Sequence, residues 1–569
     1  MSAPLPEPPN LLPPSACRWS CPPSWVRGPL YSSPEPVGLW GQLRVLSALD
    51  VLTWNPSEVP PAGLDISCSG RPGQASSVAQ ALSDRLPGRV VLLSDPSARA
   101  LRGRGSPGLL GDPEVAAVVI DPRQLTDNED AWNAVREALL FGTCAELEGE
   151  QGAGEPPAHA LRALIVIVGP DSGRKKLRET DPTYNSLWVE RVAFEPDLPR
   201  DRAGVAVVVA RLRQLSTHVG EVTNGAWRFF VEELAGRPSR RTRVALRADR
   251  VVRALVGARV IQPTGALSVQ SARQAWSELA WRGGVQQAGH RERVAKRQLQ
   301  FVTDGVQRGV VNGLMVYGGG DTSYCIPGRI TARVSVGREG IINIEREAKY
   351  SGRSFDKGVF HLAGWLRGTF VGNTHPLGLA ASIAFEQSYG KVDGDSATLA
   401  ETLAILSELS GLPLRQDVAI TGAITQRGEL LPIGSASLKV RGFWESCKAH
   451  GPLTGRQGVL LPAASVIDLQ VDREVLTDIR AGRFHIWSAE RIEDAAELLM
   501  NRASGRGTNR PGAQTVLGLV ARRLRQMSER LYPPRKPTAK SGKAPAKAGK
   551  TPAVVEKAST QKPGLSKES

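Results

Sequence analysis

The chain has 569 residues, 41% of them hydrophobic and 22% charged, and this length allows several domains with separate cores. It contains no apolar run of about eighteen residues, which excludes an ordinary transmembrane helix, and its six scattered cysteines suit a reducing compartment better than a disulfide framework. The net charge of +16 resembles that of nucleic-acid-binding proteins, but nine basic and two acidic residues fall in 533–569, where core-forming residues are scarce.

Residues 1–36 are rich in proline and show neither helical nor strand periodicity. We therefore expect an extended or disordered arm. This start also lacks the basic and apolar regions of a secretory signal, which favours a cytoplasmic protein with no membrane association.

Residues 37–215 alternate between helical patterns and short apolar runs. The pattern predicts a helix within 38–52 and strands at "RVVLLS", "VAAVVID" and "ALIVIVG", and "GVAVVVARL" also has the length of a buried strand. Such alternation is typical of an α/β domain with a mainly parallel sheet. Residues 216–299 follow with amphipathic stretches such as "VQSARQAWSELAWR", which predict a helical subdomain.

Residues 300–505 are predicted to be an α+β domain. Strands are expected at "VNGLMVYGG", "GRITARVSVG", "GIINIEREAKY", "DVAITGAITQ" and "QGVLLPA", and helices at 376–390, 396–410, 437–450 and 489–500. A C-terminal helix is expected in 506–532, followed by a basic disordered tail, 533–569.

The stretch "VDGDSATLAETLAIL" places Ser396 where an apolar helix begins. Asp395 is the expected N-cap, which would put Ser396 in the first turn, where free N–H groups could stabilise an oxyanion; Gly394 permits a tight approach. The buried stripe of this helix is predicted to comprise Leu399, Leu403, Leu406 and Leu409. The alternative is that Ser396 only caps the helix.

A nucleophilic serine needs a base, and none of the seven histidines lies in a recognisable triad motif. Lys439 is the candidate, because its helical neighbours Ala436, Leu438, Val440 and Phe443 are small or apolar. Burial among such residues would lower the pKa of the amine. The alternative is an ordinary solvated lysine on an amphipathic helix.

The block "VDGDSATLAETLAILSELSGLPLRQDVAITGAITQRGELLPIGSASLKVRGF" resembles the proteolytic domain of the Lon protease family (peptidase S16), particularly its B-type branch. The resemblance extends over nearly all of 300–500. It implies that Ser396 is the nucleophile and Lys439 the base of a Ser-Lys dyad, and that Thr421 helps to hold the lysine. Three positions depart from the family pattern: Ser435 replaces the second glycine of a pair, Leu438 an acidic residue, and Phe355 a frequent histidine.

Lon proteases contain an AAA+ ATPase module, so the resemblance implies such a domain at 37–215 and a lid-like subdomain at 216–299. The best phosphate-loop candidate is "SGRPGQASS", with Gly70, Gly73 and Ser77, but Ser76 replaces the essential lysine. Asp121 lies at the end of a strand, where the resemblance implies the acidic residue that organises magnesium. Pro122 occupies the next position, which is usually acidic in such ATPases. We expect a degenerate nucleotide site, and the sequence gives no metal site.

These features predict a serine endopeptidase that cuts peptides or unfolded proteins, with weak or no ATP hydrolysis and no cofactor required for peptide hydrolysis. The resemblance also implies a homo-oligomer, a hexameric ring. Two alternatives stay open: an ATP-dependent Lon protease with an atypical ATP/Mg site, and a non-proteolytic ring scaffold that binds partners. The basic tail could contact nucleic acid non-specifically.

Overall fold

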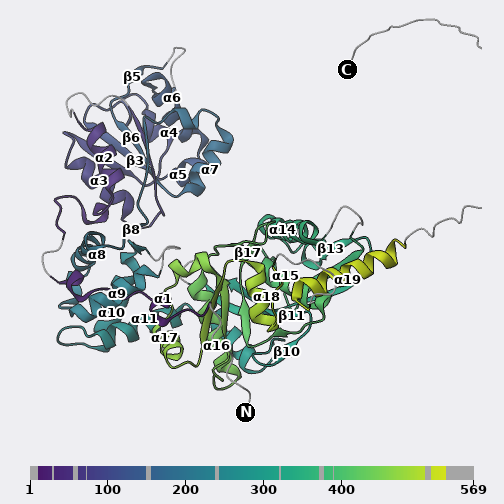
Figure 1. Cartoon of the computed structure of the whole chain (residues 1–569). Coiled ribbons are helices and arrows are strands. Elements are labelled where there is room, and N and C mark those ends of the chain that lie inside the picture. Colours follow the sequence, from purple (N-terminus) through teal and green to yellow (C-terminus); the bar gives the residue numbers. More distant parts are fainter. Residues whose placement is uncertain are drawn as a thin grey trace, which may run out of the picture.

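The computed structural model describes residues 10–27, 31–54, 62–71, 73–148, 156–236, 242–319, 322–370, 377–388, 390–506 and 514–533. Figure 1 shows an α/β part and a helical part stacked on one side of a larger α+β part. The predicted basic tail lies, apart from Pro533, outside the described residues.

The α/β part has one five-stranded parallel sheet with the strand order β2-β3-β6-β1-β7. The strands are β1 (Gly63–Ser67), β2 (Arg89–Leu93), β3 (Val115–Ile120), β6 (Leu164–Gly169) and β7 (Glu190–Ala193). Helices α2 (Leu43–Leu52), α3 (Gln74–Ser83), α6 (Glu129–Phe141) and α7 (Asp171–Thr180) accompany them. Separate apolar cores lie on the two faces of the sheet, as expected for buried parallel strands.

The helical part comprises α8 (Arg202–Leu215), α9 (Asn224–Ala235), α10 (Ala248–Ile261), α11 (Val269–Arg282) and α12 (Val285–Ala295). The strand-like run "GVAVVVARL" lies inside α8, so the interpretation as a strand was wrong. Asp201 caps this helix by accepting a hydrogen bond from the Gly204 N–H. Val205, Val208, Val209 and Leu212 share one buried face, a spacing that fits a helix and not a strand.

The C-terminal α+β part is built on a mixed seven-stranded sheet with the order β13-β14-β12-β11-β16-β19-β20. The strands are β11 (Val310–Tyr317), β12 (Tyr324–Val336), β13 (Gly340–Asn343), β14 (Leu379–Phe385), β16 (Val418–Ile420), β19 (Gly458–Pro462) and β20 (His485–Ala489). Two cores again cover opposite faces. One contains α14 (Arg353–Phe370), α15 (Thr398–Ser410), α18 (Ile492–Met500) and α19 (Val516–Leu531), and the other contains α16 (Ala436–His450) and α17 (Arg473–Arg480).

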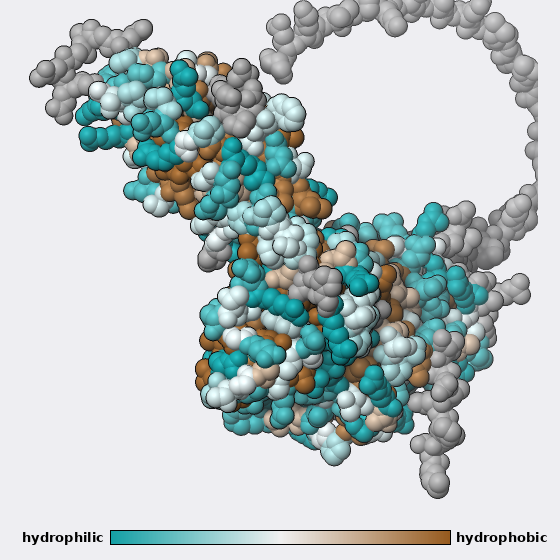
Figure 2. All heavy atoms as spheres, turned by 90° about the vertical axis from the view of Figure 1, so that its left-hand side faces the viewer, coloured by the Kyte–Doolittle hydropathy of each residue, from teal (hydrophilic) through white to brown (hydrophobic). Residues whose placement is uncertain are grey.

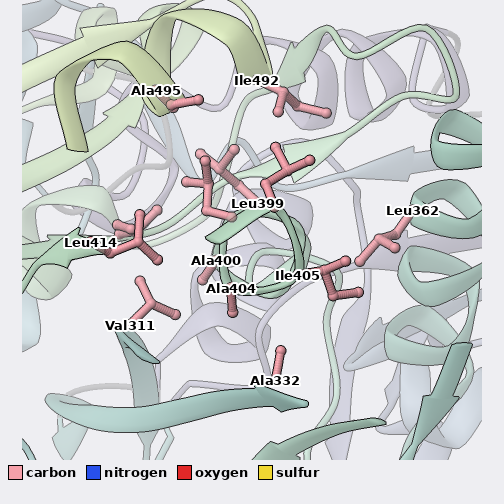
Figure 3. Close-up of a cluster of buried hydrophobic side chains, with 14 of the residues drawn as sticks. Val311, Ala332, Leu362, Leu399, Ala400, Ala404, Ile405, Leu414, Ile492 and Ala495 are labelled. Atoms are coloured by element: carbon pink, nitrogen blue, oxygen red, sulfur yellow. The ribbon is translucent and has the colours of Figure 1, made fainter. Parts of the chain in front are cut away.

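Helix α15 runs through the centre of the first core, and apolar side chains surround it in Figure 3. All four leucines of its predicted stripe are buried. The helix predicted at 376–390 is wrong: Leu379–Phe385 is strand β14, paired antiparallel with β12 and parallel with β13. Its side chains alternate between buried and half-buried, the period of a strand.

The predicted disordered arm is also corrected. Within residues 10–27, the backbone of Asn10 and Leu12 pairs with strand β20, while Cys17, Cys21 and Val26 are buried in two different cores. The segment therefore connects the helical part with the C-terminal part. The proline-rich sequence has no helical or strand period, so its pattern did not predict this packing.

Hydrophilic and hydrophobic residues are intermixed over the face seen in Figure 2. Among the described residues, no helix combines the length and the apolar character that membrane crossing requires.

Candidate active site

Ser396 lies just before helix α15, which begins at Thr398. The prediction that Asp395 is the N-cap and that Ser396 occupies the first turn is therefore wrong by about half a turn. The carbonyl of Asp395, and not its side chain, accepts hydrogen bonds from the Thr398 N–H at 3.1 Å and from Thr398 Oγ1 at 2.6 Å. Gly394 has φ +94°, a conformation that side-chain-bearing residues rarely adopt, so the need for glycine is conformational.

Lys439 reaches Ser396 from the other face of the sheet. It lies in the first turn of α16, and its Nζ is 2.7 Å from Ser396 Oγ. The two helices lie on opposite faces and bring these side chains together beyond the end of β16. Only 4% of Lys439 is exposed, whereas Ser396 is half-buried, so a substrate could approach the hydroxyl while the amine stays shielded.

Thr421 follows directly after β16 and is buried beside the amine. Its Oγ1 lies 2.8 Å from Lys439 Nζ and donates to the Ser396 carbonyl at 3.2 Å. The neighbouring Gly422 N–H donates to the same carbonyl at 2.7 Å, and the Gly422 carbonyl accepts from the Leu399 N–H. Sequence reasoning overlooked Gly422, although its place in the "TG" pair was a usable signal.

Burial lowers the pKa of Lys439 to about 8, and Cys325 and Asp395 act in the opposite direction. Removing an ammonium group from water disfavours its charged form, which is why the shift is downward. A substantial fraction of the amine is consequently neutral near physiological pH. A neutral amine in contact with a serine hydroxyl can accept its proton.

Residues 387–500 match the family model described as "Lon protease (S16) C-terminal proteolytic domain". Residues 387–500 therefore form a proteolytic domain of the Lon protease family. A Lon protease homolog of Escherichia coli K12 is 26% identical over 431 residues, which cover 74% of this chain and 72% of that protein. A homolog from Haemophilus influenzae is 36% identical over 37% of this chain and 35% of its own length.

An archaeal Lon protease of Thermococcus kodakarensis is 34% identical over 118 residues, 21% of this chain and 16% of that protein. The chain thus spans about a third or less of the Haemophilus and Thermococcus relatives. The shared Lon proteolytic domain is that of a serine-type peptidase.

The departures from the Lon pattern have structural counterparts. Ser435, which replaces a glycine, has φ +59°, so the position requires a left-handed conformation that glycine adopts more easily. Leu438 is half-buried against the core of α16. Phe355 is a core residue that packs edge-on against Phe385.

The predicted nucleotide-site residues gather at the carboxyl ends of β1 and β3. Gly70 and Gly73 have φ of +66° and +85°, and Gly73 precedes α3. Ser77 Oγ donates to the Gly73 carbonyl at 2.7 Å. A Cβ on Gly38 would lie 2.0 Å from Ser77 Oγ, so the backbone at Gly38 packs directly against the Ser77 hydroxyl.

Asp121 caps the short helix α5 (Pro122–Thr126) and is paired with Arg123. Its carboxylate accepts from the Arg123 N–H at 2.9 Å and from Nη2 at 2.6 Å. Although burial acts against it, this pairing holds the pKa of Asp121 below its usual value. The carboxylate that should organise Mg²⁺ already has a cationic partner, so Ser77 and Asp121 do not fit an ATP–Mg site.

Proposed function

We propose that this Lon-family chain is a serine endopeptidase in which Ser396 is the nucleophile and Lys439 the general base. The observation that carries the proposal is the 2.7 Å contact between Lys439 Nζ and Ser396 Oγ, formed by an amine that is 4% exposed. Such a contact lies within proton-transfer distance, and burial supplies the neutral base.

Thr421 would orient the base. Its hydroxyl proton is directed to the Ser396 carbonyl, so Thr421 Oγ1 can only accept a hydrogen bond from Lys439. One amine N–H is thereby fixed on the threonine, and the nitrogen lone pair can face the serine hydroxyl.

In acylation, Lys439 takes the Ser396 proton while Oγ bonds to the substrate carbonyl carbon. The resulting ammonium returns the proton to the departing amine when the peptide C–N bond breaks. In deacylation, Lys439 removes a proton from water, whose oxygen attacks the ester. Proton return to Ser396 Oγ then releases the carboxylic acid and restores the hydroxyl.

We further propose that the α/β part is a degenerate AAA+ module and that ATP hydrolysis is weak or absent. The strand order, the replacement of the phosphate-loop lysine by Ser76, and the pairing of Asp121 with Arg123 support this proposal. Without a motor, the substrates would be peptides and unfolded proteins. Assembly into a hexameric ring, which would restrict access to flexible chains, belongs to the same proposal.

The test is cleavage of casein and a fluorogenic peptide by the full chain without nucleotide. We expect Ser396→Ala and Lys439→Ala each to lower kcat/KM by about 10³-fold or more, because each removes one member of a catalytic unit. Lys448→Ala is the matched control, since this exposed lysine lies on the same helix. Equal activity in all four proteins, or none in the unmodified chain, would refute the assignment.

A further inference from the structure

A cavity of about 540 Å³ lies in the C-terminal part, on the side of the sheet that carries α16. Its lining includes the segment 297–304, the first residues of β11 and the last turn of α16. Gln416 lines the cavity just before β16, whereas Thr421, which contacts Lys439, directly follows that strand. The cavity and the dyad candidates therefore lie at opposite ends of β16, and its volume is that of a small-molecule site.

Two buried amide side chains line this cavity and leave their oxygens unpaired. Asn312 is 1% exposed, and its Nδ2 donates to the carbonyls of Val302 at 2.7 Å and Gln416 at 2.8 Å. Gln416 is fully buried, and its Nε2 donates to the carbonyls of Val310 at 2.9 Å and Leu414 at 3.0 Å. These bonds fix the nitrogen end of each amide, so both oxygens face away from the carbonyls. Neither oxygen has a partner among the described residues.

Arg329 adds a positive charge beside these amides. It stands opposite Asn312 in the antiparallel β11–β12 pair, so the two side chains leave the same face of the sheet as neighbours. Arg329 is half-buried and lines the cavity, and within the described part of the chain its Nε has no hydrogen-bond partner and its guanidinium forms no ion pair. The lining also contains Arg297 and Asp304, so two arginines face one aspartate and the site favours an anionic group.

A stacked pair of rings forms another part of the lining. The rings of Phe301 and His450 lie 4.7 Å apart at an angle of 15°. Burial, reinforced by Arg297, lowers the pKa of His450, so its ring is neutral and adds no charge at neutral pH. His450 Nε2 is a further buried polar atom without a partner among the described residues. The cavity thus combines a flat ring surface with unpaired acceptors and an unpaired cation.

We propose that this cavity binds a small molecule that carries N–H donors together with an anionic group, as amino acids and short peptides do. The N–H groups donate to Asn312 Oδ1 and Gln416 Oε1, and the carboxylate pairs with Arg329. A simple cation is repelled by the two arginines, and a simple anion leaves both amide oxygens unpaired. The site is independent of the proposed peptidase activity, because it shares no residue with the dyad candidates.

The test is isothermal titration calorimetry of triglycine into the full chain carrying Ser396→Ala, which prevents hydrolysis of the probe. We expect one triglycine per chain to bind with a Kd of about 1 mM or lower. N-acetyl-triglycine lacks the ammonium group and triglycine amide lacks the carboxylate, so each should bind about tenfold more weakly. Glycine distinguishes the two sources: binding as tight as that of triglycine assigns the site to amino acids, and weaker binding assigns it to peptides.

Arg329→Met should weaken triglycine binding about tenfold or more, because it removes the partner of the carboxylate. Arg333→Met is the matched control, since Arg333 lies on the same strand with 84% of its side chain exposed, and it should leave the Kd unchanged. Urea unfolding of both variants verifies that they are folded. If Arg329→Met does not fold, the comparison of capped and uncapped probes in the Ser396→Ala chain still decides.

Three results overturn the proposal. The absence of saturable binding would show that water alone satisfies the amide oxygens. Equal binding of the capped and uncapped probes would show that the two charged ends are not recognised. Binding that a folded Arg329→Met variant retains in full would place the peptide elsewhere on the chain, the region of the dyad candidates included.

Discussion

At the scale of single residues, the function proposed for this chain depends on one amine that is kept out of water. The pKa of Lys439 is lowered to about 8 mainly by burial, and no carboxylate hydrogen-bonds to its Nζ among the described residues. Because only the neutral form can accept the Ser396 proton, we expect kcat/KM to rise about tenfold per pH unit below pH 8 and to level off above it. A pH–rate profile measures this directly.

Thr421→Val should change that profile in two ways. The charged amine loses a hydrogen-bond acceptor, so the midpoint should move to lower pH. The base also loses its orientation, which should reduce the plateau about tenfold to a hundredfold. Thr402→Val, which removes another buried hydroxyl from the same region, should leave the midpoint near pH 8. An unshifted midpoint in Thr421→Val would contradict the orienting role.

At the scale of elements, Glu232 of α9 connects three segments. It is fully buried, accepts from the Cys21 N–H at 3.0 Å, and forms ion pairs with Arg18 at 3.7 Å and with Arg473. Glu232→Ala would leave the Arg18 guanidinium buried without this carboxylate. We expect a loss of about 3 kcal/mol in the free energy of unfolding, measured with urea.

The exposed pair Arg525–Glu529 provides the control, because Glu529→Ala removes a carboxylate that water already screens. A loss as small for Glu232→Ala as for Glu529→Ala would show that the N-terminal segment is not anchored through this residue.

At the scale of the whole molecule, a peptidase part is joined to an α/β part in which Ser77 hydrogen-bonds to Gly73 and Asp121 is paired with Arg123. We expect phosphate release from ATP to stay at the background rate, and casein cleavage to be the same with and without ATP and Mg²⁺. Ser77→Ala should alter neither measurement. Cleavage that ATP accelerates would instead support the ATP-dependent alternative. The proposed hexameric ring predicts that light scattering gives six times the 61.0 kDa chain mass.

Periodic patterns in the sequence predicted several helices and strands of the fold. The leucine stripe predicted α15, and the runs "RVVLLS", "VAAVVID" and "ALIVIVG" predicted β2, β3 and β6 of the parallel sheet. Patterns failed where a short apolar run suits either element. "GVAVVVARL" became helix α8 and 379–385 became strand β14, because the neighbours that bury each face decide between the two periods.

The sequence by itself determined which residues are chemically suited to the site: Ser396 shortly after Gly394, which permits a tight approach, and Lys439 among small and apolar neighbours. Only the tertiary structure decided that they meet, because they lie 43 positions apart: Ser396 just precedes α15, Lys439 lies in α16, and these helices cover opposite faces of one sheet. The same holds for the packed N-terminal segment. Burial and proximity depend on contacts between distant segments, and local sequence does not encode those contacts.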